Sequence, residues 1–294
     1  MTPRIAWLAS YPKSGNTWVR IFLSALLQDD ADELDINKLS IGSMLCDRNR
    51  LDNVLCFETG TLAQDHAAHL RLIACRWINQ NLEERLYSKI HDANLKLKNG
   101  ELAIPADVTD KALYIIRNPL DVAVSYTHFS GMPLDKIIKR MGNEHATLAK
   151  NTLQKQDFQL EQVMGTWSQH VQSWTENSDF EVHVVRYEDL INTPQESFLK
   201  ICRYFDLPHS AAEIKKAIEA TSFKTLQSQE KASKFREAPQ SAERFFRSGR
   251  AGDWKSALSE QQVSEILKSH LSTMQKFGYA DKLGQPCLTQ ALAT

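Results

Sequence analysis

A short segment near the N-terminus combines residue types that bind oxyanions. It reads Ser10-Tyr11-Pro12-Lys13-Ser14-Gly15-Asn16-Thr17-Trp18 and lies between an apolar run and a helical pattern. A loop from a strand into a helix gathers unpaired backbone N–H groups at the positive end of the helix dipole, which favours phosphate or sulfate. Gly15 permits close backbone approach, and Lys13 adds a full charge. The spacing is not that of a Walker A loop, because Lys13 precedes Gly15. Taken alone, the segment also fits a capped helix with an incidental lysine.

A second cationic turn stands at Arg117-Asn118-Pro119. It also follows an apolar run and opens a helical pattern, which puts the guanidinium at the carboxyl end of a strand and lets Ser125 face the same crevice. Guanidinium groups bind phosphate through charge-assisted hydrogen bonds. Two anion-binding loops on one parallel sheet predict a nucleotide with separated phosphates.

A third segment mixes arginine, glycine and aromatic residues without helical or strand periodicity. It reads Phe245-Phe246-Arg247-Ser248-Gly249-Arg250-Ala251-Gly252-Asp253-Trp254. Two readings are open for it: a polar surface loop anchored by Trp254, or a further part of the anion site.

The elements that must position these segments alternate between strand and helix. Strands are expected at Ile5–Ser10, Ala112–Arg117 and Val182–Tyr187, and a shorter one at Leu86–His91. Helical spacing of apolar residues follows the first three, after Thr17, Pro119 and Pro194, and two more helices are expected near 159–174 and 259–277. This alternation predicts an α/β fold with a central parallel sheet flanked by helices in three layers.

No composition shift or Pro-, Gly- or Ser-rich linker divides the chain, so we predict one domain over residues 1–294. The segments 35–60, 131–157 and 227–243 have no clean period and are expected to form irregular lid and substrate loops.

Composition excludes several classes of protein. The chain has 294 residues, 42% of them hydrophobic, and a net charge of -1, which gives no general reason to bind nucleic acid or an anionic membrane. Its five cysteines form no C-x-x-C pair, so neither a disulfide framework nor a zinc site is indicated. His66 and His69 share one helix face without a third ligand, and we expect no metal. Without a signal segment or an apolar span, the protein is expected in the cytoplasm.

With these segments in hand, the sequence resembles the cytosolic type of sulfotransferase that uses 3'-phosphoadenosine 5'-phosphosulfate (PAPS), in a form like its bacterial members. Residues 11–18 resemble the family's 5'-phosphosulfate loop, residues 117–126 its 3'-phosphate motif, and residues 247–255 its R-x-G-x-x-G-D-W-K segment. The three motifs stand in the family's order and reach across most of the chain. The resemblance implies the P-loop-like α/β fold and transfer of a sulfuryl group to a small-molecule hydroxyl or amine, with 3'-phosphoadenosine 5'-phosphate (PAP) as product.

The resemblance also implies roles for individual residues. Lys13 would contact the bridge of the phosphosulfate, and the base and a second lysine would come from the K-x-H motif as His91 and Lys89; an imidazole suits proton transfer near neutral pH. The 5'-phosphate would be bound by Ser14, Gly15, Asn16, Thr17 and Trp18. The 3'-phosphate would be bound by Arg117, Ser125, Arg247, Ser248 and Gly249. The adenine would be bound by Trp18, Tyr187, Thr221 and Phe223, and Phe246 would also belong to the cofactor site.

Three departures from the family pattern stand out. Asn16 replaces a usual threonine, and Ser248 replaces a usual lysine, so the third cation at the 3'-phosphate is either absent or supplied by Arg250. The dimer motif of the animal enzymes has no match after Trp254, so the oligomeric state does not follow. Two other functions compete with sulfuryl transfer: a Mg²⁺-dependent P-loop kinase or NTPase, and a nucleotide-binding module without catalysis.

Overall fold

The computed structural model describes residues 2–28, 34–150, 157–239 and 241–289. Their Cα positions form two compact units. Unit 1 comprises the described residues of Met1–Tyr11, Gly42–Tyr114 and Asn143–Val184, and unit 2 those of Pro12–Ile41, Ile115–Gly142 and Val185–Thr294. The division into two units does not test whether the chain folds as one domain, so the single domain expected from the sequence stays a prediction.

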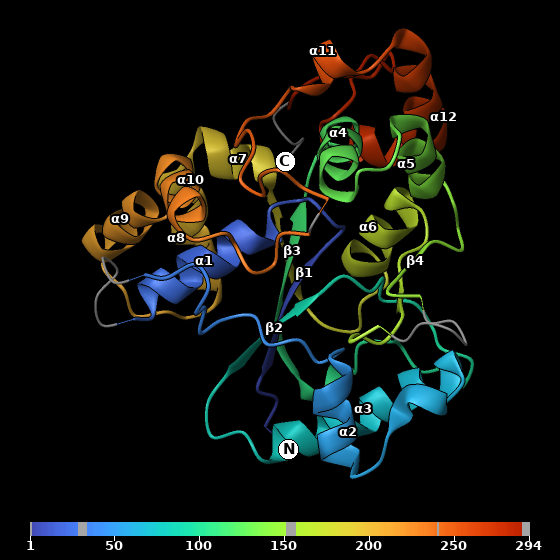
Figure 1. The fold of residues 1–294 in the computed structure, drawn as a ribbon, viewed down its shortest axis with the longest axis vertical. Helices are drawn as coiled ribbons and strands as arrows, with labels where there is room; N and C mark the ends of the chain where they lie inside the picture. Colours follow the sequence, from blue (N-terminus) through green and yellow to red (C-terminus); the bar gives the residue numbers. More distant parts are fainter. Residues whose placement is uncertain (1, 29–33, 151–156, 240, 290–294) are drawn as a thin grey trace. The chain divides into compact units, whose positions relative to one another are not determined.

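One sheet of four strands forms the centre of the fold, in the order β2-β1-β3-β6. Its strands are β1 (Ile5–Ser10), β2 (Leu86–Ile90), β3 (Thr109–Ile116) and β6 (Val182–Arg186). β1 and β2 run parallel, with Ile5 opposite Leu86 and Ala9 opposite Ile90 (Figure 1). Every residue of β1 is buried, as expected of an apolar run inside an α/β sheet. The predicted α/β fold, with a central parallel sheet flanked by helices, is confirmed.

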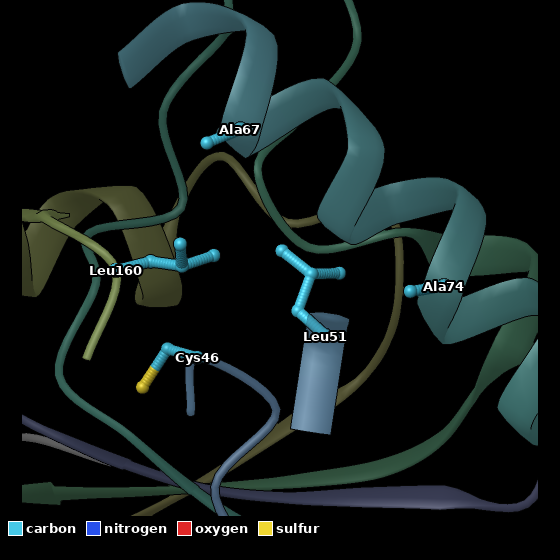
Figure 2. Packing of buried hydrophobic residues seen from close by; sticks show 5 residues of the cluster. All are labelled: Cys46, Leu51, Ala67, Ala74 and Leu160. Atoms are coloured by element: carbon cyan, nitrogen blue, oxygen red, sulfur yellow. The ribbon is translucent and has the colours of Figure 1, made fainter. Parts of the chain in front are cut away.

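Unit 1 adds helices and short strands to β1 and β2. They are α2 (Arg48–Leu55), η2 (Thr59–Thr61), α3 (Gln64–Gln80), η3 (Ala106–Val108), β4 (Thr147–Leu148), β5 (Gln162–Val163) and α6 (Trp167–Thr175). Figure 2 shows part of its core, where Leu51 of α2 lies among Ala67 and Ala74 of α3, Leu160 and Cys46.

Unit 2 is mainly helical. Its helices are α1 (Asn16–Leu26), α4 (Pro119–Ser130), α5 (Leu134–Met141), α7 (Tyr187–Asn192), α8 (Pro194–Tyr204), α9 (Ala211–Ala220), α10 (Phe223–Ala232), α11 (Trp254–Ala257) and α12 (Glu260–Lys276). Phe22 of α1 stacks on Phe198 of α8, with ring centroids 4.0 Å apart. This buried pair fixes α1, and therefore the loop before it, within the unit.

The structure corrects one predicted helix. The expected helix near 159–174 begins only at Trp167, because Gly165 has a φ of 62° and Thr166 forms a capping box with Gln169. The sequence contains the Ser/Thr-x-x-Glu/Gln pattern of such a cap at Thr166 and Gln169, and this pattern could have predicted where the helix begins.

The prediction that the segments 35–60, 131–157 and 227–243 are irregular is wrong in part. They contain α2, α5 and the second half of α10, while residues 151–156 and 240 lie outside the description. α2 begins where Asp47 accepts a hydrogen bond from the Arg50 N–H, and it is held by the burial of Leu51. Among the described helices, none is both long enough and apolar enough to cross a membrane.

Candidate active site

The loop before α1 places backbone donors at the positive end of a helix. Gly15 is the N-cap residue, with a φ of 103°, and Lys13 has a φ of 69°. The Gly15 carbonyl accepts from the N–H groups of Trp18 and Val19, and no side chain in the described ranges caps the helix. The start of α1, at the positive end of the helix dipole, is therefore a position that suits an anion.

Two buried polar atoms beside this helix end have no hydrogen-bond partner within the described residues: Ser14 Oγ and Arg117 Nε. Ser14 is only 1% exposed. An unsatisfied buried polar group costs about 1–3 kcal/mol, so its presence in a native fold calls for an explanation. An oxyanion bound beside either atom would accept a hydrogen bond from it.

Gly15 is required by space as well as by backbone conformation. A Cβ built on Gly15 would lie 2.5 Å from Cδ2 of Tyr187, a residue 8% exposed. The Tyr187 ring also meets the Trp18 ring edge to face, at a centroid distance of 6.2 Å. The aromatic ring thus packs directly on the anion loop.

The ammonium group of Lys13 lies between two aromatic rings of unit 2. Its Nζ is 3.9 Å from the centroid of the Phe129 ring and 4.4 Å from that of Phe245. Cation–π contacts of this kind stabilise a charge by about 0.5–2 kcal/mol. They hold the lysine head group near the end of α4.

Arg117 connects the first loop to the third segment. Its Nη1 donates to the Lys13 carbonyl at 3.0 Å and its Nη2 to the Arg250 carbonyl at 3.3 Å. Its guanidinium carbon also lies 4.3 Å from the centroid of the Tyr187 ring. Arg117 therefore holds the predicted motifs together through backbone carbonyls and aromatic stacking.

A buried carboxylate that the sequence did not reveal supports the turn at Arg117. Glu188 accepts from the Asn118 N–H at 3.0 Å and from the Tyr279 hydroxyl at 2.8 Å. Burial raises its pKa to about 7, although hydrogen bonds and the nearby Arg117 charge oppose the shift. The Asn118 side chain in turn accepts from the Leu120 N–H and so caps α4.

Two further carboxylates hold the third segment. Asp121 of α4 accepts from the N–H groups of Gly252, at 2.7 Å, and Trp254, at 3.1 Å, and burial raises its pKa. Glu230 of α10 accepts from the N–H groups of Phe245 and Phe246. These carboxylates order a segment that has no regular secondary structure of its own.

The predicted adenine residues are connected by direct contacts. Trp18 Nε1 donates to the Thr221 carbonyl at 3.0 Å. A Cβ on Gly249 would lie 2.4 Å from the Phe223 ring, so Gly249, with a φ of 61°, allows that ring to pack on the backbone. The Phe223 ring meets Phe246 edge to face at 6.3 Å.

The charges of the third segment are paired internally. Arg247 Nη2 lies 2.7 Å from Asp253 Oδ2, and Arg250 Nε donates to Ser248 Oγ at 3.3 Å. Burial alone would raise the pKa of Asp253. The hydrogen bonds from Ser248 and Arg247 have the larger combined effect, so the pKa of Asp253 is lowered. Arg250 contacts Arg117 through the Arg250 backbone carbonyl described above.

The K-x-H motif belongs to unit 1. Lys89 is half-buried on β2 opposite Leu8, and His91 follows the strand. His91 Nδ1 lies 2.8 Å from the carbonyl oxygen of Ser10. Because a carbonyl can only accept, Nδ1 carries the proton, and Nε2 is the basic nitrogen of the neutral ring.

The predicted residues are thus divided between the units. Unit 2 brings together Lys13, the residues Ser14–Trp18, Arg117, Tyr187, Thr221, Phe223, Phe246, Arg247, Ser248 and Gly249. Ser125 is half-buried on α4 of the same unit, and Lys89 and His91 lie in unit 1. Within the described residues, no group of three His, Cys, Asp or Glu gathers as a metal site, so His66 and His69 form none there.

A cavity of about 590 Å³ opens in unit 2 along α10, Ala238 and the segment 242–244. Its charged lining consists of Lys224, Glu230, Lys231, Lys234, Glu243 and Arg244. The volume is in the usual range for small-molecule sites.

Comparison with known proteins identifies the family. The sequence profile of the sulfotransferase domain matches residues 3–278. Sulfotransferase 1A1 of Canis lupus familiaris is 26% identical over 282 residues, which cover 92% of this chain and 83% of that one. This chain therefore belongs to the sulfotransferase family, whose members catalyse sulfuryl transfer.

Solved structures of similar fold agree. Mouse sulfotransferase SULT7A1, crystallised with PAP, superposes with a TM-score of 0.59 at 18% identity and covers 96% of this chain and 87% of that one. Retinol dehydratase, crystallised with androsterone and PAP, gives a TM-score of 0.61 at 17% identity, with 94% of this chain and 82% of that one covered. These two likenesses concern the fold.

Proposed function

We propose that this enzyme transfers the sulfuryl group of PAPS to a hydroxyl or amine of a small molecule. The observation that carries the proposal is the pair of buried polar atoms, Ser14 Oγ and Arg117 Nε, that lack a partner in the described residues beside the first amides of α1. Ser14 and the start of α1 suit the phosphosulfate, and Arg117 suits the 3'-phosphate.

The residues of unit 2 fit the donor's chemistry. Asn16, Thr17 and the loop amides suit the 5'-phosphate, and Arg117, with Ser125, Arg247 and the backbone at Ser248 and Gly249, suits the 3'-phosphate. The rings of Trp18, Tyr187, Phe223 and Phe246 suit the adenine. The internal pairing of Arg247 with Asp253 leaves Arg117 as the cation we assign chiefly to the 3'-phosphate.

The transfer itself is a displacement at sulfur. The acceptor oxygen or nitrogen forms a bond to sulfur, the bond from sulfur to the bridging oxygen breaks, and PAP leaves with the electron pair. Lys13 neutralises the charge that grows on the bridging oxygen, while His91 Nε2 takes the acceptor's proton. Lys89 supplies a second cation.

The acceptor is proposed to be a small molecule, and the cavity along α10 has the volume to bind part of one. A cytoplasmic location, and the lack of a nucleic-acid or membrane partner, remain part of the proposal.

Calorimetry with PAP and with adenosine 5'-phosphate tests the donor assignment. Arg117→Gln is expected to reduce the preference for PAP by roughly 10- to 100-fold, because a hydrogen bond to a charged group is worth about 1.5–3 kcal/mol. Arg244→Gln, at an exposed arginine of the same unit, is the matched control. An unchanged preference in Arg117→Gln would remove the 3'-phosphate assignment.

A screen of phenols, alcohols, amines and sugars with radiolabelled PAPS, with and without Mg²⁺, tests the reaction. Metal-independent labelling of one class is expected. PAP binding without labelling of any acceptor would instead favour a nucleotide-binding module, and ATP or GTP turnover that requires Mg²⁺ would favour a kinase or NTPase.

A further inference from the structure

The end of β2, where His91 follows Ile90, is held by helix α6 of the same unit. His170 of α6 is fully buried, and its Nε2 lies 3.0 Å from the backbone carbonyl oxygen of His91. On the other side of the ring, His170 Nδ1 lies 2.8 Å from the hydroxyl of Tyr114, which is also fully buried.

The chemistry of these groups fixes the direction of both hydrogen bonds. A carbonyl can only accept, so His170 Nε2 carries a proton and donates it to His91. In the neutral ring Nδ1 is then an acceptor, and the Tyr114 hydroxyl donates to it. Burial lowers the pKa of His170 to about 4, against a raising effect of the His91 carbonyl, so the ring stays neutral at ordinary pH.

One turn further along α6, Trp174 makes the equivalent contact with the next residue. Its Nε1 donates to the backbone carbonyl of Asp92 at 2.9 Å. His170 and Trp174 are four residues apart and therefore share one face of α6. They donate to two successive carbonyls, and the Tyr114 ring packs on both, with centroids 5.7 and 6.2 Å away.

The same short stretch is fixed through its other polar groups. The His91 N–H donates to Gln162 Oε1 at 3.1 Å, and the His91 side chain donates to Ser10. The Asp92 carboxylate is paired with Arg71 at 2.8 Å in a buried ion pair. These contacts restrain the backbone at His91, and the direction of the imidazole depends on that backbone.

We propose that His170 is a positioning residue for the transfer reaction: it orients the peptide of His91 so that the imidazole presents Nε2 to the acceptor. The proposal rests on the function of His91 as the base, described above. A base must be held within a fraction of an ångström of its productive position, and a displacement of about 1 Å can reduce turnover by about 100-fold.

The first test needs no acceptor. Long-range ¹⁵N–¹H NMR spectra report which nitrogen of each histidine carries its proton. We expect the Nδ1–H form of His91 in the native protein and a mixture of forms in His170→Leu, which fills the space but cannot donate. His170→Gln keeps an N–H near the position of Nε2 and is expected to restore the native form.

The second test measures turnover with the acceptor found in the screen. His170→Leu is expected to lower kcat about tenfold while the KM for PAPS changes less than twofold, since the donor residues lie in unit 2. Trp174→Phe is the matched control: it removes an N–H donated one residue further along, and its kcat should stay within threefold of the native value. In a His91→Ala background, His170→Leu should cause no additional loss.

The outcomes separate this proposal from the function on which it rests. If His170→Leu lowers only the melting temperature, with the His91 spectrum and kcat unchanged, or lowers kcat equally in the His91→Ala background, the positioning role is overturned. If His91→Ala retains native turnover, the assignment of the base fails first, and the positioning role fails with it. If no acceptor is labelled by the native protein, the proposed reaction fails, whatever the NMR spectra show.

Discussion

The two functional regions of the molecule are built in different ways. In unit 2 the residues proposed to bind the donor rely on the backbone: helix amides, a glycine that lets Tyr187 approach, and carbonyls that receive the Arg117 guanidinium. In unit 1 the proposed base is held mainly by oriented side chains, because Gln162 and His170, together with the Ser10 carbonyl, fix the position of His91.

This difference reflects what each region must do. Phosphate and sulfate oxygens accept hydrogen bonds from many directions, so several backbone N–H groups and a few cations bind them well. A general base needs one lone pair in one direction, and a network of oriented side chains supplies that. Substitutions in the two regions should therefore fail in different ways.

The largest expected effect is that of Lys13→Ala on the donor side. Without the ammonium group, charge on the leaving oxygen loses its nearest cation, and turnover should fall about 10²- to 10³-fold. Single-turnover assays with radiolabelled PAPS measure it, with Lys136→Ala, at an exposed lysine of α5, as the control for lost charge. Native turnover in Lys13→Ala would refute the catalytic assignment.

Gly15→Ala tests the reliance of unit 2 on its backbone. The added methyl group would lie 2.5 Å from the Tyr187 ring at a residue with a φ of 103°. We expect a loss of about 2–4 kcal/mol in unfolding free energy and a weaker affinity for PAP, measured by denaturation and calorimetry.

Gly131→Ala is the control for backbone strain alone. Gly131 also has a positive φ, of 70°, but its nearest neighbour lies 3.6 Å from the added Cβ. It should cost only about 1 kcal/mol and leave the affinity for PAP unchanged. Equal losses in the two variants would show that the contact with Tyr187 is unimportant.

A third prediction concerns pH, because each unit buries a histidine: His170 in unit 1 and His270 in unit 2. Burial lowers the pKa of His270 from 6.5 to about 4, so the unfolded chain binds a proton at a higher pH than the folded one. Stability is therefore lost as pH falls from about 6.5 towards 4, and from pH 7 to 5 the loss is about 2 kcal/mol.

Denaturation of the native protein and of His270→Gln at both pH values measures this effect. The native protein should lose about 2 kcal/mol more than the variant between pH 7 and pH 5. A difference that does not depend on pH would mean that His270 has the same pKa in the folded and the unfolded chain.

The contrast between the units also explains what could be predicted from the sequence. The strand-to-helix junctions that carry lysine, glycine and arginine could be located from the sequence, and α1 and α4 follow them as expected. Their binding of the donor stays a prediction. The buried carboxylates Asp121 and Glu188 and the half-buried Glu230 were missed, because their partners are backbone N–H groups elsewhere in the sequence.

On the base side, the K-x-H motif located His91, but its support could not be predicted. His170 stands in α6, 79 positions from His91, and nothing in its local sequence distinguishes it from a surface histidine. The helices α2, α5 and α10 escaped prediction for a related reason: they are short, and tertiary burial of a few residues, such as Leu51, stabilises them.

The smallest expected effect is that of Ser14→Ala. Together with a control in α1, this variant distinguishes a hydroxyl that binds the donor from one that stabilises the fold. Ser14 Oγ lacks a partner in the described residues, so Ser14→Ala should leave the melting temperature unchanged or slightly raise it. If the hydroxyl serves the donor, the affinity for PAP should fall about fivefold, as expected for the loss of one hydrogen bond of about 1 kcal/mol.

Ser24→Ala is expected to show the opposite behaviour. Ser24 Oγ accepts from the Ile41 N–H at 3.2 Å, and the variant would leave that half-buried donor without its acceptor. Its melting temperature should fall while its affinity for PAP stays native, because the bond it breaks serves the fold alone. If both variants lost stability and kept their affinity, the hydroxyl of Ser14 would belong to the fold, and the donor cradle would consist of the backbone amides and the cations only.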